Sequence, residues 1–362
     1  MSLSLHELHH GLGARFGELN GAEIVADYGD WPAEHAALRA GAGVIDLSFR
    51  SRICLTGADR ARFLHGQVTN DVKKLRAGEG CYAAVTTAKG KMESDLNIFA
   101  LADELLLDFE PGLTGKISAR LERFIVADDV QIVDVAPHYG LLSVQGPKTE
   151  EVVRSLNLFP EIPAKLLASL KFSDATLGEI YLANNPRHGT SGFDLFVPDN
   201  SLGAVTDKLI AAAKQIGGRA IGWTAFEATR IEAGIPRFGA DMDETNIPLE
   251  CGIESRAITY TKGCYIGQEV INRIHSVGHV NRELRGLRLA DDLKVLPARG
   301  DKLFFNGKEV GHVTSVVKSP SLNANVALGY VRREANQIGN ELTLRTAVGE
   351  SLAKIVELPF VK

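Results

Sequence analysis

The stretch Asp95–Phe109, DLNIFALADELLLDF, predicts two adjacent strands joined by a short turn. Apolar side chains occupy every second position of its first half, at Leu96, Ile98 and Ala100. The alternate positions carry a carboxylate, an amide and an aromatic ring, on Asp95, Asn97 and Phe99. Successive side chains of a strand point to opposite faces, so we expect one face to pack on a core and the other to present polar groups.

The flanking residues predict the rest of one α+β unit. Strand patterns occur at three more places, Arg52–Thr56, Tyr82–Thr86 and Val130–Val135. Helix patterns occur at Ala58–His65 and where Leu113, Ile117, Leu121 and Phe124 fall at helical spacing. This order predicts a ferredoxin-like subdomain over about residues 51–135, inserted into a larger region that spans residues 1–280.

The C-terminal residues follow a different pattern. From about Leu284, short strand patterns alternate with turns, and Asn306-Gly307 lies between two apolar runs. Asn-Gly in that setting is the strongest short-range signal for a hairpin. We therefore expect residues 281–362 to form a separate small β-barrel domain.

Composition excludes several classes of protein. The 362 residues are 45% hydrophobic and 23% charged, which is ordinary for a globular chain and excludes disorder and collagen-like repeats. A net charge of -5 argues against a nucleic-acid footprint over the whole chain. Apolar runs are too short for a membrane span, and the start of the chain lacks a secretory pattern. Four cysteines without a CxxC pair suit a reducing compartment, so a cytoplasmic location is expected.

Several familiar motifs fail. Gly11–Gly17 misses the spacing of the dinucleotide fingerprint and lacks a preceding strand. The histidines His6, His9 and His10 are expected to lie in a mobile, solvated terminal segment. The cysteines lack zinc-site spacing, and we predict no metal site.

The segment Thr261–Arg273, TKGCYIGQEVINR, has the densest chemistry. Glycines on both sides of Cys264 permit close approach of a ligand, and Lys262 lies two residues before the thiol. Because a nearby ammonium favours the thiolate form, this spacing predicts that Cys264 is a nucleophile or redox group. A buried structural cysteine in a Gly-rich turn explains the same residues, and the sequence does not choose between the two.

Lys262–Glu269, KGCYIGQE, resembles the signature of YgfZ-type folate-binding proteins. These are relatives of the glycine-cleavage T-protein (aminomethyltransferase) and are linked to iron–sulfur cluster assembly or repair. The resemblance covers nearly the whole chain. Its segments are His35–Ser48, Phe63–Val72, Val144–Lys148 and Arg230–Pro248, and Thr314–Pro320 and Ala327–Val331 fit the C-terminal barrel of the family. It implies an α+β, three-lobed T-protein-like fold with a ferredoxin-like subdomain and a C-terminal β-barrel.

The resemblance also implies a site for tetrahydrofolate. Asp95 aligns with the family carboxylate that hydrogen-bonds near N10 of the folate, and it is therefore a predicted catalytic and cofactor-binding residue. Tyr82 and Asp194 fall where the family has a ligand-contacting tyrosine and a pterin-binding glutamate. The alternatives are an Asp95 that faces water on an edge strand, a Tyr82 in ordinary core packing and an Asp194 in a solvated loop.

Two departures separate this chain from the T-protein pattern. Phe226 stands where the family has a folate-contacting arginine, and Asn184–Ser191 replaces a run with aromatic and charged side chains. These losses count against aminomethyl transfer.

The sequence thus supports three functions. The first is a tetrahydrofolate-binding protein of iron–sulfur cluster assembly or repair, with Cys264 as its reactive group and iron–sulfur enzymes or assembly proteins as partners. The second is an aminomethyltransferase of the glycine cleavage system, and the third is a non-catalytic folate-binding scaffold. Whether the chain is an enzyme stays open at this point.

Overall fold

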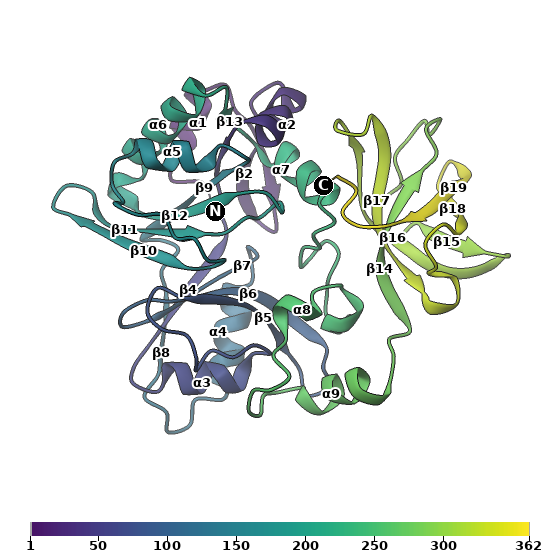
Figure 1. Cartoon of the computed structure of the whole chain (residues 1–362), viewed down its shortest axis with the longest axis horizontal. Coiled ribbons are helices and arrows are strands. Elements are labelled where there is room, and N and C mark those ends of the chain that lie inside the picture. The colour runs from purple at the N-terminus through teal and green to yellow at the C-terminus, as the bar shows by residue number, and fades with distance from the viewer. Residues whose placement is uncertain (1, 362) are drawn as a thin grey trace. The chain divides into compact units, whose positions relative to one another are not determined.

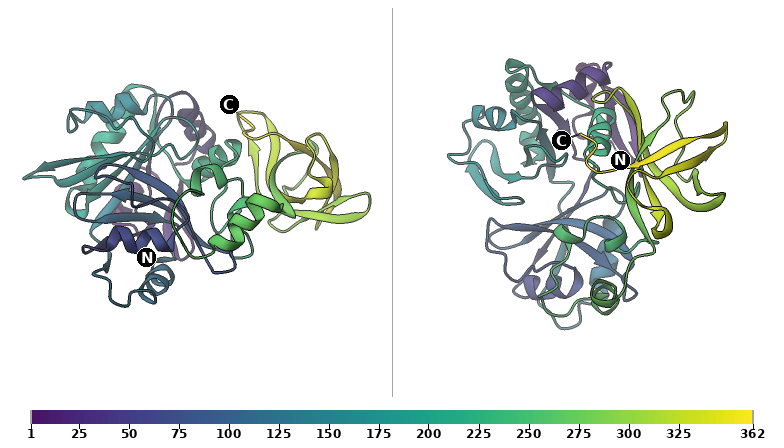
Figure 2. Two further views of the ribbon diagram at one scale, coloured as in Figure 1. Left: turned by 60° about the horizontal axis from the view of Figure 1, so that its bottom comes forward. Right: turned by 45° about the vertical axis from the view of Figure 1, so that its right-hand side comes forward.

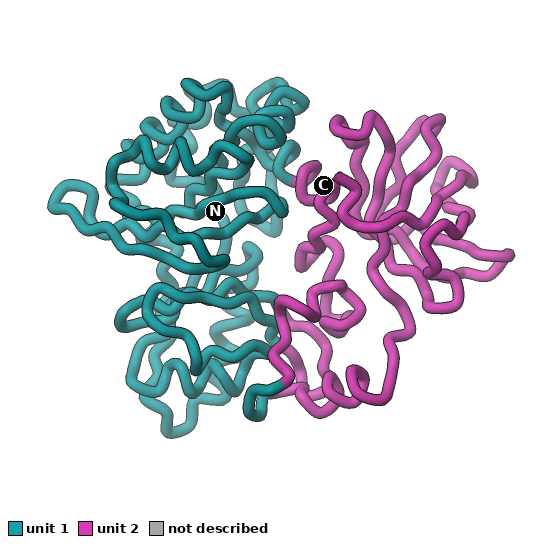
Figure 3. The backbone as a smooth tube through the Cα atoms, in the orientation of Figure 1, with its two compact units in different colours: residues 1–85, 94–226, 261–265 teal, residues 86–93, 227–260, 266–362 magenta. Residues whose placement is uncertain are grey.

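The computed structural model describes residues 2–361, which fall into two compact units (Figure 3). Unit 1 comprises residues 1–85, 94–226 and 261–265, and unit 2 comprises residues 86–93, 227–260 and 266–362. Residues 1 and 362, the outer ends of the two predicted domains, lie outside the described residues. The predicted boundary at residues 280 and 281 stays a prediction.

A five-stranded sheet forms the first half of unit 1 (Figure 1). Its strands, in spatial order, are β5 (Gly80–Thr86), β6 (Met92–Ala100), β7 (Leu105–Phe109), β4 (Ser51–Thr56) and β8 (Gln131–Asp134). Two helices accompany it, α3 (Arg60–Gln67) and α4 (Thr114–Glu122). The predicted order of strands and helices is confirmed. Leu96, Ile98 and Ala100 are buried in one core with Ile117 and Leu121 of α4, as the strand alternation predicts.

A six-stranded sheet forms the second half of unit 1. Its strands, in spatial order, are β10 (Ser169–Asp174), β11 (Gly178–Asn184), β12 (Gly192–Pro198), β9 (Tyr139–Gln145), β3 (Gly43–Asp46) and β13 (Arg219–Ala220). The helices α2 (Trp31–Ala40), α5 (Thr149–Ser155) and α6 (Asp199–Gln215) belong to this half. Apolar residues of α5 and α6 pack on alternate residues of β9 and β12, such as Val144 and Leu195.

The other faces of β9 and β12 meet the five-stranded sheet. Phe196 of β12 packs edge-on against Phe99 of β6, with ring centroids 5.4 Å apart. Asp194 precedes Phe196 by two residues and lies on the same face of β12. The polar faces of the two sheets of unit 1 therefore face each other.

The N-terminal segment adds α1 (His6–Gly11), β1 (Arg15–Leu19) and β2 (Ala22–Asp27). The expectation of a solvated histidine segment is wrong for His9, whose exposed fraction is 1%. Its ring bonds Asp46 at 2.9 Å and the hydroxyl of Tyr28 at 2.9 Å. These two hydrogen bonds satisfy the buried ring of His9, and a local sequence pattern does not reveal partners 19 and 37 residues away.

Unit 2 is built around a closed six-stranded barrel (Figure 2). Its strands are β14 (Arg282–Leu289), β15 (Lys302–Phe305), β16 (Lys308–Ser319), β17 (Ala324–Arg332), β18 (Glu341–Thr346) and β19 (Gly349–Val356). Asn306 and Gly307 have φ of 51° and 77°, and they form the predicted tight turn between β15 and β16. The short helical elements of the chain's middle part are α7 (Trp223–Glu232), η1 (Pro248–Glu250), α8 (Glu254–Ala257) and α9 (Gln268–Val277), and η2 (Arg333–Ala335) follows β17.

Within residues 2–361, no helix combines the length and the apolar character that a bilayer crossing requires.

Candidate functional site

Asp95 and Tyr82 form a hydrogen-bonded pair on the polar face of the five-stranded sheet. The Tyr82 hydroxyl donates to Oδ2 of Asp95 at 2.7 Å. Tyr82 is buried, whereas Asp95 is half-buried. Strand β6 has β5 on one side and β7 on the other, so the edge-strand alternative for Asp95 is wrong. The structure therefore brings together two of the predicted site residues, while their role toward folate stays a prediction.

Asp108 of β7 continues this polar face. The Asn97 amide donates to its Oδ2 at 3.0 Å, and the guanidiniums of Arg50 and Arg187 donate to the two oxygens at 2.7 and 2.9 Å. Asp108 has an exposed fraction of 0%. Burial alone raises the pKa of this carboxyl, but Arg50 and Arg187 outweigh burial and hold the pKa well below its usual range. Asp108 is therefore an ionised anchor between the two sheets.

Asp194 is a strand residue at the centre of unit 1. It lies in β12 with an exposed fraction of 0%, so the solvated-loop alternative is wrong. Its oxygens accept hydrogen bonds from Ser143 Oγ at 2.7 Å and from Asn185 Nδ2 at 2.8 Å. Arg187 adds Nε at 3.1 Å and Nη2 at 2.6 Å. These donors fill the carboxylate, so the predicted contact of Asp194 with a pterin requires one of them to leave.

Sequence reasoning missed Arg187 and Asp108. Arg187 lies in the run Asn184–Ser191, which was interpreted only as a loss of family contacts. Asp108 carried a usable signal, because it is a carboxylate within the apolar strand pattern Leu105–Phe109. A charge at such a position needs a buried partner, and Arg187 is one.

An aromatic cluster lies next to Arg187 along the chain. The ring of His188 meets Phe226 edge-on with centroids 4.1 Å apart, and Trp223 stacks on Phe226 at 5.3 Å. Phe49 packs edge-on against Trp223 at 5.5 Å. Phe226 is thus part of a largely buried aromatic cluster at the position where the resembled family has an arginine.

Cys264 and Lys262 of the KGCYIGQE segment lie in different surroundings, one exposed and one buried. Cys264 is exposed, so the alternative of a buried structural cysteine is wrong. The Lys262 ammonium donates to the carbonyl oxygens of His65, Val68 and Asn70 at 2.5, 2.6 and 2.8 Å. Burial lowers the pKa of Lys262 to about 8. Lys262 therefore fastens the chain around residues 65–70, and the reactivity of Cys264 stays a prediction.

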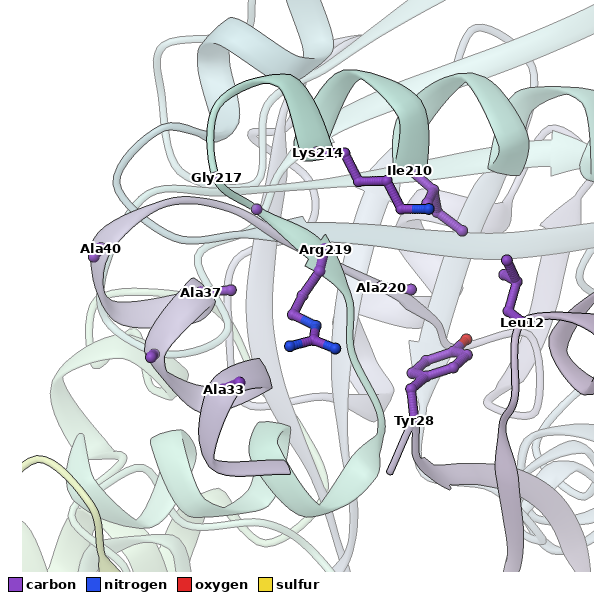
Figure 4. A pocket seen from close by; sticks show the side chains of 12 residues that line it. Leu12, Tyr28, Ala33, Ala37, Ala40, Ile210, Lys214, Gly217, Arg219 and Ala220 are labelled. Carbon is purple, nitrogen blue, oxygen red and sulfur yellow. The ribbon is translucent and has the colours of Figure 1, made fainter. Parts of the chain in front are cut away.

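A separate groove of about 660 Å³ lies between α2 and the end of α6 (Figure 4). Alanines of α2 line it together with Lys214 and Arg219. Within the described residues, its lining contains none of the predicted site residues Tyr82, Asp95, Asp194 and Cys264. The candidate site is therefore distinct from this groove.

Comparisons with known proteins agree with this architecture. The sequence profile of the GCVT N-terminal domain matches residues 5–262, and that of the glycine cleavage T-protein C-terminal barrel domain matches residues 282–362. The chain is similar to an aminomethyltransferase of Halalkalibacterium halodurans, with 28% identity over 359 residues, 99% of this chain and 97% of the relative. An aminomethyltransferase of Bacillus subtilis is also 28% identical over 359 residues, which are 99% of this chain and 98% of that protein.

A solved structure shows the same fold. It is the glycine cleavage system aminomethyltransferase T from Bartonella henselae, with a TM-score of 0.89 and 25% identity. The match covers 100% of this chain and 98% of that one. The predicted T-protein-like fold with its C-terminal barrel is confirmed, and the chain belongs to the glycine cleavage T-protein family.

Proposed function

We propose that this protein binds tetrahydrofolate and transfers an aminomethyl-derived one-carbon unit to it. The products are methylene-tetrahydrofolate, ammonia and the free thiol of the donor. The C–S and C–N bonds of an aminomethyl thioether break and two N–C bonds to the folate form, so the two folate N–H protons leave with the thiol and the ammonia. Similarity to aminomethyltransferases over 99% of the chain supports this reaction.

The single observation that carries the proposal is the Tyr82–Asp95 pair. The 2.7 Å hydrogen bond holds the carboxylate in one orientation on the polar face of β6. A fixed carboxylate accepts a hydrogen bond from a folate amine and takes up its proton as the nitrogen attacks carbon. Positioned groups of this kind contribute roughly 10²–10⁴-fold to a rate.

The aromatic cluster supports the binding of a flat ring. Phe226 stands where the family pattern has an arginine, and the half-buried ring of Trp223 stacks on it. Aromatic faces pack well on heteroaromatic ligands and compensate for a lost polar contact. The departure at Phe226 then changes how the cofactor is held without removing its site.

The test is an assay of the purified chain with tetrahydrofolate and an aminomethylated lipoyl carrier protein. We expect release of ammonia together with methylene-tetrahydrofolate. Asp95→Asn lowers the rate by about 10²–10⁴-fold, and Asp103→Asn, an exposed carboxylate of the same hairpin, leaves it unchanged. A folded chain that binds tetrahydrofolate and releases no ammonia contradicts aminomethyl transfer and leaves the scaffold function.

A second candidate rests on the exposure of Cys264. An accessible thiol within KGCYIGQE supports the YgfZ-type function in iron–sulfur cluster assembly or repair, with cluster enzymes or assembly proteins as partners in the cytoplasm. The test measures the activity of cluster enzymes in a strain that lacks the gene. Cys264→Ala is expected to fail to restore it where Thr261→Ala, an exposed neighbour, succeeds. Full rescue by Cys264→Ala removes the thiol from that function.

A further inference from the structure

The guanidinium of Arg187 has one occupied and one open edge. Its Nε and Nη2 donate to Asp194, and Nη2 also donates to Asp108. Among residues 2–361, Nη1 has no hydrogen-bond partner, and it is not one of the enclosed unpartnered atoms of the structure. The side chain as a whole has an exposed fraction of 10%. Two N–H donors of a nine-tenths buried, fully charged group are therefore directed away from the carboxylates.

The position of Arg187 is fixed by its backbone as well. The Arg187 amide donates to Oε1 of Gln145 at 2.9 Å, and Gln145 Nε2 donates to the carbonyl of Asn185 at 2.9 Å. Gly192 makes room for the Gln145 side chain that accepts this bond, because a Cβ at Gly192 would lie 2.1 Å from Gln145 Oε1. A side chain held at both its backbone and its tip is preorganised for recognition.

The charges around Arg187 select the kind of ligand. The guanidiniums of Arg187 and Arg50 are hydrogen-bonded to three carboxylates, those of Asp108, Asp194 and Glu110. Two positive and three negative charges give this hydrogen-bonded cluster a net charge of -1. The cluster has no surplus positive charge to attract an anion. A neutral hydrogen-bond acceptor, such as a ring carbonyl, suits the open edge better.

The location of Arg187 relative to Asp95 fits one ligand. Asp108 pairs with Asn97 across β6 and β7, and Asp95 lies two residues from Asn97 on the same face. Asp95 and Asp108 are therefore diagonal neighbours on adjacent strands, and the Cα atoms of such neighbours lie about 7–8 Å apart. The strip from Asp95 through Asp108 to Arg187 is thus on the scale of a bicyclic ring and its first substituent.

We propose that Arg187 is a specificity-determining residue that donates through Nη1 to the lactam carbonyl of the bound pterin. This inference rests on the proposed binding of tetrahydrofolate. The family resemblance implies that Asp194 accepts hydrogen bonds from the donor edge of the pterin. Because the oxygens of Asp194 already accept bonds from protein groups, we infer that Arg187 recognises the acceptor edge of the pterin instead. A 4-amino pteridine places a donor where the carbonyl acceptor was, so it meets the guanidinium donor to donor.

The test compares two matched ligands by titration calorimetry on the full chain. One is tetrahydrofolate, with a 4-oxo ring, and the other is its 4-amino counterpart. We expect the wild-type protein to prefer the 4-oxo ligand by about 10- to 100-fold. Arg187→Lys keeps the positive charge beside Asp108 and Asp194 but lacks the second planar amino group, so the preference is expected to fall below about threefold. Arg154→Lys, at an exposed helix position, is the matched control and keeps the preference.

The outcomes separate this inference from the proposed function. Binding of neither ligand to a folded wild-type chain overturns folate binding itself. Binding of tetrahydrofolate with no preference over the 4-amino ligand, or a preference that Arg187→Lys retains, overturns the role of Arg187 and leaves folate binding intact. Tighter binding of the 4-amino ligand assigns recognition to the donor edge and likewise overturns the inference.

Discussion

The ammonium of Lys262 donates a 2.8 Å hydrogen bond to the backbone carbonyl of Asn70. The side-chain amide of Asn70 in turn donates a 2.8 Å hydrogen bond to the backbone carbonyl of Tyr82. The lysine of the KGCYIGQE segment therefore supports the strand that carries Tyr82. Through the Tyr82 hydroxyl this support extends to Asp95. A chain of hydrogen bonds thus connects Lys262 of the KGCYIGQE segment to the carboxylate of Asp95.

Lys262→Met is expected to destabilise the fold by about 2–3 kcal/mol. The change leaves the carbonyls of His65, Val68 and Asn70 without their donor, and a buried acceptor without a partner is costly. Denaturant unfolding monitored by circular dichroism measures the loss. Lys73→Met, at an exposed position nearby, is expected to leave stability within about 0.5 kcal/mol of the wild type. Equal stability of the two variants would show that the three bonds contribute nothing net.

Tyr82→Phe is expected to slow one-carbon transfer about tenfold and to reduce stability by about 1 kcal/mol. The ring stays in place, but the carboxylate of Asp95 loses the donor that orients it. Steady-state kinetics with tetrahydrofolate measures the effect, and Tyr181→Phe, whose hydroxyl bonds exposed Glu179, serves as the control. An unchanged rate for Tyr82→Phe would mean that Asp95 needs no orientation by the phenol.

Acid is expected to unfold the protein partly through Asp108. Its pKa is held below the usual range in the folded state, so the folded chain binds fewer protons than the unfolded chain in acid. The stabilisation is complete at neutral pH and is lost as pH falls below about 4–5 toward the folded pKa. Unfolding free energies between pH 7 and pH 3 measure this slope.

Asp108→Asn provides the matched variant for that measurement. It removes a carboxylate that faces two buried guanidiniums, so we expect a loss of about 3–5 kcal/mol at pH 7. The variant should also show a shallower decline of stability in acid, because the titrating group is gone. Parallel acid profiles for the two proteins would assign the decline to other carboxylates.

Local patterns predicted the elements and the faces, because both depend on nearest neighbours along the chain. The alternation in Asp95–Phe99 placed Asp95 and Asn97 on the polar face of β6, and Asn306-Gly307 marked the hairpin of the barrel. What the patterns could not supply is the pairing of distant charges. Arg187 and Asp108 are separated by 79 residues, and only the stacking of two sheets brings them together.

The contacts of Lys262 could not be predicted from the sequence for a similar reason. Its nearness to Cys264 along the chain suggested an effect on the thiol, but the ammonium donates to carbonyls 192 to 197 residues away. Sequence distance is a poor guide to the direction of a long side chain in a turn. Exposure of Cys264 was equally unpredictable, since free cysteines are among the most often buried residues.

Cys264 is expected to be the one rapidly alkylated thiol of the native protein. The described structure exposes Cys264, whereas it buries Cys54 and Cys251 and half-buries Cys81. Burial also raises the pKa of Cys81 to about 12, so little of it is thiolate near neutral pH, and alkylation requires the thiolate.

Mass spectrometry after brief iodoacetamide treatment at pH 7.5 should therefore find a single adduct, located on the tryptic peptide that contains Cys264. Cys264→Ser should abolish it, while denaturant should release all four thiols of the wild type. Fast modification of Cys81 or Cys54 in the folded protein would instead mean that the five-stranded sheet opens readily. The Tyr82–Asp95 pair lies on that sheet and would then lack the rigidity on which its proposed role depends.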